Sequence, residues 1–180
     1  MRHIAWLVIR LTTGGLLTGH GAQKLFGWFG GSGPAGTARM LESLGIRPGR
    51  PWAYLAGLGE FLGGTLTALG LFHPFGPMLI IGVMSVATGT AHRGKPIWVA
   101  KGGAELPVTN MANALGLTLA GPGRFSLDSM LGIGLPRALV PLWAATVLGI
   151  VLLAVSRTRM PQAQVGTASG EAPAPERRVA

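Results

Sequence analysis

The chain has 180 residues, of which 48% are apolar and only 12% are charged, and its formal net charge is +9. A soluble domain usually carries about 25% charged residues, so this composition favours a membrane protein. The basic residues lie between and after apolar segments and form no continuous patch with interleaved aromatic residues, so we expect no nucleic-acid partner. There is no cysteine, which excludes disulfides, thiol redox chemistry and thiolate-held metal clusters.

Five apolar segments fill most of the chain, and they cover residues 4–19, 52–72, 75–91, 106–120 and 138–155. A helix needs about 20 residues, with a range of about 17–25, to cross the hydrocarbon core of a bilayer. The first segment extends to about residue 23, and the fourth is short and contains two asparagines. The sequence therefore predicts an all-α integral membrane protein, a bundle of four core transmembrane helices with a fifth C-terminal helix.

The connections between these segments differ in character. Residues 21–51 form a long glycine-rich connection between the first two segments. Residues 37–44 within it are predicted to form a short amphipathic helix. A connection of this length suits a lid or a re-entrant element. Gly59 and Gly63 have the G-x-x-x-G spacing that lets another helix approach closely. The run 121–123 stops the fourth helix. We expect residues 1–156 to form the membrane domain and 157–180 a disordered polar tail.

Charge counting predicts an orientation. With five spans, eleven basic residues share one side, namely Lys24, Arg39, Arg47, Arg50, Arg93, Lys95, Lys101, Arg157, Arg159, Arg177 and Arg178. The opposite side holds Arg2, Arg124 and Arg137. The bias would nearly vanish if the fourth segment did not cross, which favours five spans. By the positive-inside rule the N-terminus lies outside and the C-terminus in the cytoplasm.

Ionisable residues gather at corresponding ends of these segments. His20 and Lys24 close the first segment, Glu60 sits in the opening half of the second, His92 closes the third and Glu105 opens the fourth. Because consecutive helices alternate in direction, all five residues belong to one half of the membrane. This arrangement predicts a polar, inward-facing site.

Two charges, Arg10 and Glu60, lie deepest in apolar sequence, where a charge costs roughly 2.5–3.5 kcal/mol on insertion scales and usually faces inward and pairs. Their depths are compatible with contact between antiparallel neighbours. One interpretation is an internal salt bridge that fixes helix register. The other is that Glu60 binds or protonates a ligand.

The two histidines, His20 and His92, sit at one membrane level on parallel helices. Histidine titrates near neutrality and can pass protons to a reduced quinone, although simple residence at the interface explains both positions equally well. No further ligand spacing supports a metal or a haem, so neither is predicted.

Three polar residues of the fourth segment, Glu105, Thr109 and Asn113, share one helix face. The helix dipole favours a carboxylate at Glu105 without any function. The ordinary role of Asn110 and Asn113 would be hydrogen bonding between helices. After Arg124, Ser126 and Asp128 have the pattern of loop or capping residues near the opposite surface.

Two later motifs, residues 101–107 (KGGAELP) and 121–128 (GPGRFSLD), strongly resemble the DoxX family. The earlier pattern agrees in order, with Arg10-Leu11, Gly19-His20-Gly21 with Lys24, the run 59–64 (GEFLGG), and His92. The resemblance covers about residues 4–131, and segment 138–155 and the tail are additions to it. Catalytic templates such as a phosphate-binding loop, H-E-x-x-H or a nucleophile elbow are missing.

The resemblance implies a small integral membrane subunit linked to quinone-dependent respiratory or sulfur redox chemistry, since related subunits belong to thiosulfate:quinone oxidoreductases. The cofactor would be a quinone, and the partners would be the lipid bilayer of the plasma membrane and another protein or a second copy. The catalytic candidates are Glu60, His92 and Glu105, and the cofactor-binding candidates are Arg10, His20, Lys24 and Asn113. The alternative is a non-catalytic membrane scaffold or assembly partner of a redox complex. A transporter is less favoured, because inverted repeats are not evident.

Overall fold

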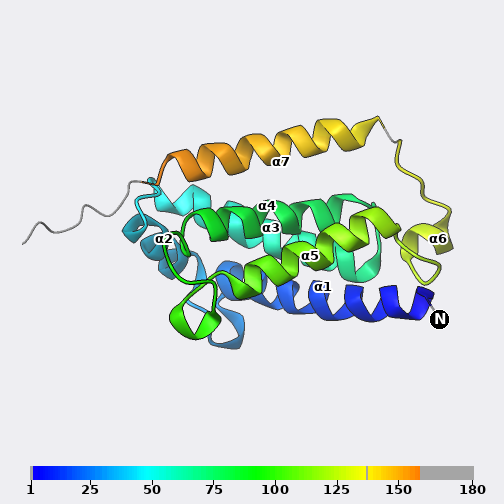
Figure 1. The fold of residues 1–180 in the computed structure, drawn as a ribbon, viewed down its shortest axis with the longest axis horizontal. Coiled ribbons are helices and arrows are strands. Elements are labelled where there is room, and N and C mark those ends of the chain that lie inside the picture. The colour runs from blue at the N-terminus through cyan, green and yellow to red at the C-terminus, as the bar shows by residue number, and fades with distance from the viewer. Residues whose placement is uncertain (1, 137, 159–180) are drawn as a thin grey trace, which may run out of the picture.

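Five long helices dominate the computed structural model, which describes residues 2–136 and 138–158. They are α1 (Arg2–Phe26), α3 (Gly49–Leu69), α4 (Phe75–Gly89), α5 (Glu105–Ala120) and α7 (Leu139–Ser156). They run side by side in alternating directions along the long axis of the molecule (Figure 1). The short helices α2 (Gly33–Ser43) and α6 (Leu127–Leu131) lie at opposite ends. The described residues contain no strand, so the all-α prediction is confirmed.

The helix boundaries follow the predicted segments with shifts of a few residues. Helix α1 continues to Phe26, beyond the expected end near residue 23. Helix α3 begins at Gly49 and ends at Leu69, because Gly70 turns the chain with a φ of 62°, a conformation that glycine adopts without strain. The predicted stop after α5 is confirmed at Ala120, and α2 occupies the place of the predicted amphipathic helix. The proposed polar tail lies almost entirely outside the described residues.

One helix in the described part of the chain, Leu139–Ser156, is long and apolar enough to cross a membrane by itself. Helix α4 is apolar but has only 15 residues. The expected fifth, C-terminal helix is therefore the one that has the length and apolar composition of a membrane span. The core of four spans stays a prediction.

Helices α1 and α3 are in backbone contact. A Cβ atom placed on Gly14 would lie 2.6 Å from the carbonyl oxygen of Gly64, and one on Gly21 would lie 2.3 Å from the backbone nitrogen of Phe61. Real Cβ atoms do not approach other atoms so closely, so only glycine fits at these positions. Gly15, on the other side of α1, has nothing within 4 Å.

Helix α4 is held closely on two sides. A Cβ atom on Gly59 of α3 would lie 2.4 Å from Val83 Cγ1, which confirms the predicted close approach at this G-x-x-x-G spacing. On the other side, a Cβ atom on Gly82 would lie 2.6 Å from Val147 Cγ1 of α7. The same pattern recurs between Gly89 and Val155. Helix α7 is thus seated on α4 through two glycines.

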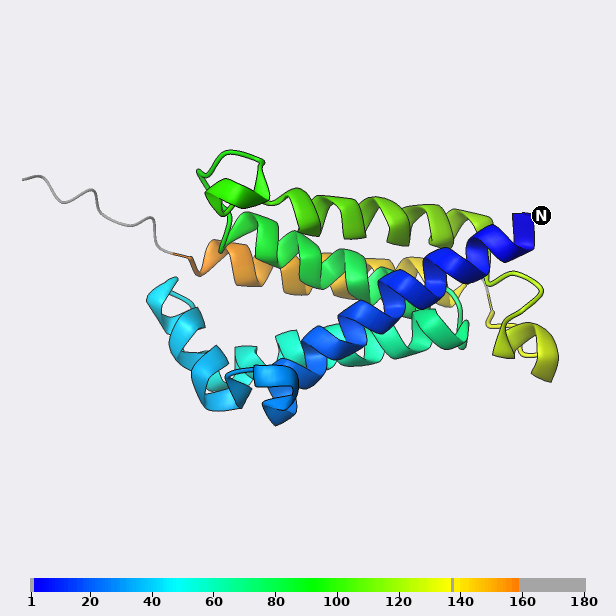
Figure 2. The same cartoon turned by 90° about the horizontal axis from the view of Figure 1, so that it is seen from below.

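The bundle is a wedge rather than a uniform cylinder. Toward α2, helix α4 diverges from α3, so the α1–α3 pair separates from the group α4, α5 and α7 (Figure 2). A buried cluster of Leu17, Ile80, Met84 and Ala114 closes the inner part. At the wide end, α2 packs on the start of α3 through Ala38, Leu41, Ile46 and Ala53.

Candidate functional site

The wide end of the wedge holds a cavity of about 570 Å³. Its wall comes from α1, α2, α3, α4, α5 and α7 and is mostly apolar. The ionisable side chains in the wall are His20, Lys24, Glu60 and His92, joined by the amide of Asn110. A largely apolar cavity with a few converging polar groups is the usual form of a small-molecule site. Four of the seven sequence-predicted site residues therefore share one cavity.

The polar wall is centred on an ion pair between Lys24 and Glu60. Lys24 lies in the last turn of α1, and its Nζ donates to Oε2 of Glu60 on α3. Glu60 is 6% exposed, and a carboxylate this buried needs a partner for its charge. Within residues 2–136 and 138–158 this is the only salt bridge. The pair places a cation and an anion together on the cavity wall.

His92 and His20 line the same cavity as the ion pair. His92, just after α4, donates from Nδ1 to the carbonyl oxygen of Gly102 at 2.7 Å, because a carbonyl can only accept. In the neutral ring this fixes the proton on Nδ1 and leaves Nε2 as an acceptor. His20 makes a contact of 3.1 Å between its Nδ1 and Oε1 of Gln23, and its side chain is exposed.

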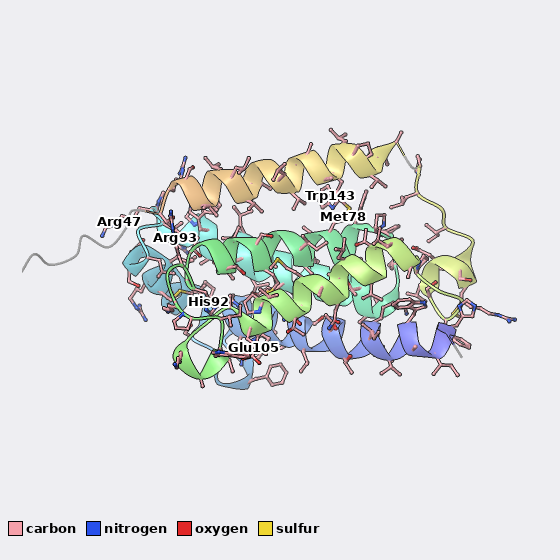
Figure 3. All side chains as sticks on the ribbon, viewed as in Figure 1. Arg47, Met78, His92, Arg93, Glu105 and Trp143 are labelled. Atoms are coloured by element: carbon pink, nitrogen blue, oxygen red, sulfur yellow. The ribbon has the colours of Figure 1, made fainter. Side chains whose placement is uncertain are left out.

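Glu105 and Asn113 lie near the cavity but not in its wall. Oε2 of Glu105 accepts from the backbone N–H of Val99 at 2.8 Å, so the carboxylate organises the loop between α4 and α5; Figure 3 shows it near His92. Asn113 donates to Thr13 Oγ1 at 3.2 Å and so links α5 to α1. Asn113 thus makes the interhelical hydrogen bond expected of a buried asparagine.

Arg10 lies elsewhere, and the expected salt bridge with Glu60 is wrong. Its guanidinium donates to the carbonyl oxygens of Ala68 at 3.1 Å and Phe125 at 3.0 Å, and also to that of Pro122. Because α1 continues to Phe26, Lys24 reaches the level of Glu60, and Arg10 is left fourteen residues away, about 21 Å along the helix. Arg10 is 4% exposed and does not line the cavity.

Sequence reasoning missed the importance of Asp128. Its two carboxylate oxygens accept from the backbone N–H groups of Phe72 and His73, each at 2.8 Å, and it is 5% exposed. The predicted capping role is found at Ser126, whose Oγ accepts from the N–H of Ser129. Asp128 instead holds the α3–α4 turn, more than fifty residues away. No local sequence signal reports such a contact.

His73, in that turn, contacts the carbonyl oxygen of Thr118 through Nε2 at 3.3 Å. Burial lowers the pKa of His73 below its ordinary value, although the Thr118 carbonyl and Asp128 act in the opposite direction. The imidazole is therefore biased toward its neutral form. The described residues contain no cluster of three potential metal ligands.

The fold and the cavity define a small all-helical protein with an amphiphilic internal site. Residues 5–93 match the family model DoxX, and the chain belongs to the DoxX family, a family of membrane proteins. The match covers α1 to α4, with Lys24, Glu60 and His92. The motifs at 101–107 and 121–128, and the whole of α7, lie beyond it. No curated protein and no solved structure matches the chain.

Proposed function

We propose that this protein is an integral membrane subunit that binds a quinone in the wedge cavity and serves quinone-dependent respiratory or sulfur redox chemistry. The observation that carries the proposal is the Lys24–Glu60 ion pair in the wall of an otherwise mostly apolar cavity of about 570 Å³. A quinone has two carbonyl oxygens on a flat apolar ring. Both the polar wall and the apolar volume suit that chemistry.

In this proposal α1, α3, α4 and α5 cross the bilayer as a core, and α7 crosses beside them. At 1.5 Å per residue, α1 and α3 are about 37 and 31 Å long, close to the roughly 30 Å hydrocarbon core. Helices α4 and α5 are shorter than the hydrocarbon core. In this proposal the loops and α2 at the wide end would fill the remaining depth of the membrane. The basic residues around that end support a cytoplasmic position for it.

The residues of the polar wall have separate tasks. Lys24 would donate a hydrogen bond to one quinone oxygen, and a charge-assisted bond of this kind is worth about 1.5–3 kcal/mol. Glu60 would accept a hydroxyl proton from the reduced form, and Nε2 of His92 would take it onward toward the surface. The quinone, when bound, supplies the capacity to carry two electrons and two protons. Because the chain has no cysteine, an oxidoreductase partner would supply or remove the electrons.

The test is the quinone content of protein purified gently in native lipid, measured by organic extraction. Glu60→Gln removes the charge but keeps the shape, and we expect quinone per protein to fall about tenfold, equivalent to about 1.4 kcal/mol. Glu42→Gln is the matched control on α2 at the same end of the bundle, because Glu42 is exposed and lies outside the cavity wall, and its quinone content should stay at the wild-type level. Quinone-free wild-type protein would contradict the proposal.

The second candidate is a non-catalytic scaffold. It is favoured by one observation, that Lys24 and Glu60 already satisfy each other inside the protein. In that case Glu60→Gln would be lost from the membrane, since breaking a buried pair is strongly destabilising, and the wild-type protein would carry no quinone. Stable Glu60→Gln protein with reduced quinone content would exclude the scaffold.

A further inference from the structure

The cavity has two chemically different sides. The side toward α1 and α5 carries Lys24, Glu60, His92 and Asn110. The side toward α7 is apolar, and we call it the α7 trough. It is lined by Leu55, Leu58 and Leu62 of α3, by apolar side chains of α4, and by Trp143, Ile150 and Val151 of α7.

The trough has the geometry of a channel with a floor and two walls. Leu55, Leu58 and Leu62 recur at helical spacing and so form one stripe along α3. The residues of α7 form the facing stripe, and α4 lies between them. From Trp143 to Val151 the wall extends about 12 Å along α7, at 1.5 Å per residue. Figure 3 shows Trp143 between α7 and α4 at one end.

The trough is continuous with the polar wall and open to the outside. Both sides belong to the same cavity, so a molecule can occupy them together. Leu58 and Ile150, which line the trough, are 43% and 41% exposed. An apolar channel that opens between two helices leads into lipid when the helices are in a membrane.

We infer that the α7 trough binds the hydrocarbon tail of the ligand whose ring lies at Lys24 and Glu60. This inference rests on the proposed function, and it specifies the ligand as a long-chain quinone rather than a ring without a tail. A tail of this class needs no polar partner, and the trough offers it hydrocarbon and one indole ring. The tail would leave the protein between α3 and α7.

The trough acts by shape and not by hydrophobic driving force. Lipid chains are as apolar as leucine side chains, so moving a tail from the bilayer into the trough gains little free energy. The ring contacts then supply the affinity, and the trough decides which tails fit. The wall of α7 lies outside the family match at 5–93, so this side of the cavity belongs to the part of the chain that extends beyond the matched region.

The test compares a quinone with a ten-carbon tail and the same ring with a methyl group, both titrated at equal mole fraction into nanodiscs holding the full chain. Ile150→Trp fills the trough. We expect it to weaken binding of the tailed quinone about tenfold or more, the size of an overpacking penalty, and to leave binding of the tailless ring unchanged. Leu148→Trp is the matched control, because Leu148 is exposed and does not line the cavity.

A second measurement reports whether α7 stays in place in the variant. Cβ atoms at positions 89 and 155 would lie 3.8 Å apart, which suits a disulfide, and the chain has no other cysteine. Gly89→Cys with Val155→Cys should therefore cross-link both with and without Ile150→Trp. If the cross-link forms and Ile150→Trp binds both quinones as the wild type does, or loses both equally, the tail site is wrong. If the wild type binds neither quinone, the proposed function itself fails.

Discussion

The two ends of the bundle use buried charge in opposite ways. At the narrow end, Arg10 donates to three backbone carbonyls and Asp128 accepts from two backbone N–H groups, and the adjoining space is only about 10 Å³. At the wide end, Lys24 and Glu60 pair with each other beside a cavity of about 570 Å³. Charge at the narrow end therefore holds the backbone, and charge at the wide end borders an open cavity.

In the proposed function, this difference separates polar groups that hold the fold from those that bind a ligand, without reference to residue type. Arginine and aspartate in apolar surroundings are usually read as functional, yet here their hydrogen-bonding capacity is directed at the backbone. A lysine–glutamate pair has donors and acceptors to spare, and these border the cavity. Substitutions at each end of the bundle test this contrast.

Arg10→Met should have the largest effect. It leaves Asp128 without a nearby cation and removes the partner of three carbonyls in a buried site, so we expect a loss of about 3–5 kcal/mol in the free energy of unfolding. Thermal unfolding in mild detergent measures it. Arg124→Met, at the same end but exposed, should stay within about 0.5 kcal/mol of the wild type. Equal losses of unfolding free energy in the two variants would show that Arg10 has no special structural role.

A double-mutant cycle on Lys24→Met and Glu60→Gln should give an intermediate effect. Each single change leaves one charge without its counter-ion on the cavity wall, and the double change removes both charges, so we expect a coupling energy of about 0.5–3 kcal/mol. The same unfolding assay provides all four values. No second substitution can offset the loss of Arg10 in this way, because its partners are backbone carbonyls that no substitution removes. Additive effects at Lys24 and Glu60 would show that the pair contributes nothing to stability.

The pH dependence at His73 should give the smallest effect. Burial lowers the pKa of His73 in the folded protein, so the unfolded chain, with a pKa near 6.5, takes up a proton first as the pH falls. Stability should therefore be constant above about pH 6.5 and decline below it. His73→Asn should flatten that decline in unfolding midpoints measured from pH 8 to 5.5. Parallel curves for the variant and the wild type would contradict this.

The positions of the helices could be read from the sequence because apolar run length and the stop at Gly121 are local signals, whereas α3 ends at Leu69, before the end of the apolar run 52–72. The gathering of Lys24, Glu60 and His92 at one end followed from alternating helix direction alone. Local patterns do not report how far a helix continues past its apolar run. The register of α1 on α3 follows from the contacts of Gly14 with Gly64 and of Gly21 with Phe61. It places Lys24, in the extended last turn of α1, beside Glu60 and leaves Arg10 at the other end.

Long-range contacts through loops were beyond the sequence for a different reason. Asp128 looks like an ordinary capping residue, and only the folded chain brings it to Phe72 and His73. The α7 trough likewise depends on which face of a uniformly apolar helix turns inward. Apolar composition leaves that rotation open, and the contacts of Gly82 and Gly89 with α7 determine it.

The glycine contact between α1 and α3 determines how this molecule can move. Sliding or rolling of α1 would drive Gly14 into the backbone at Gly64, so the two helices are coupled as one stiff arm. The α3–α4 turn joins this arm to α4 at the narrow end of the wedge, opposite the cavity. Asp128 holds the backbone of that turn by accepting from the N–H groups of Phe72 and His73. A carboxylate at the end of the bundle opposite the cavity therefore fixes the turn that joins the two arms of the wedge.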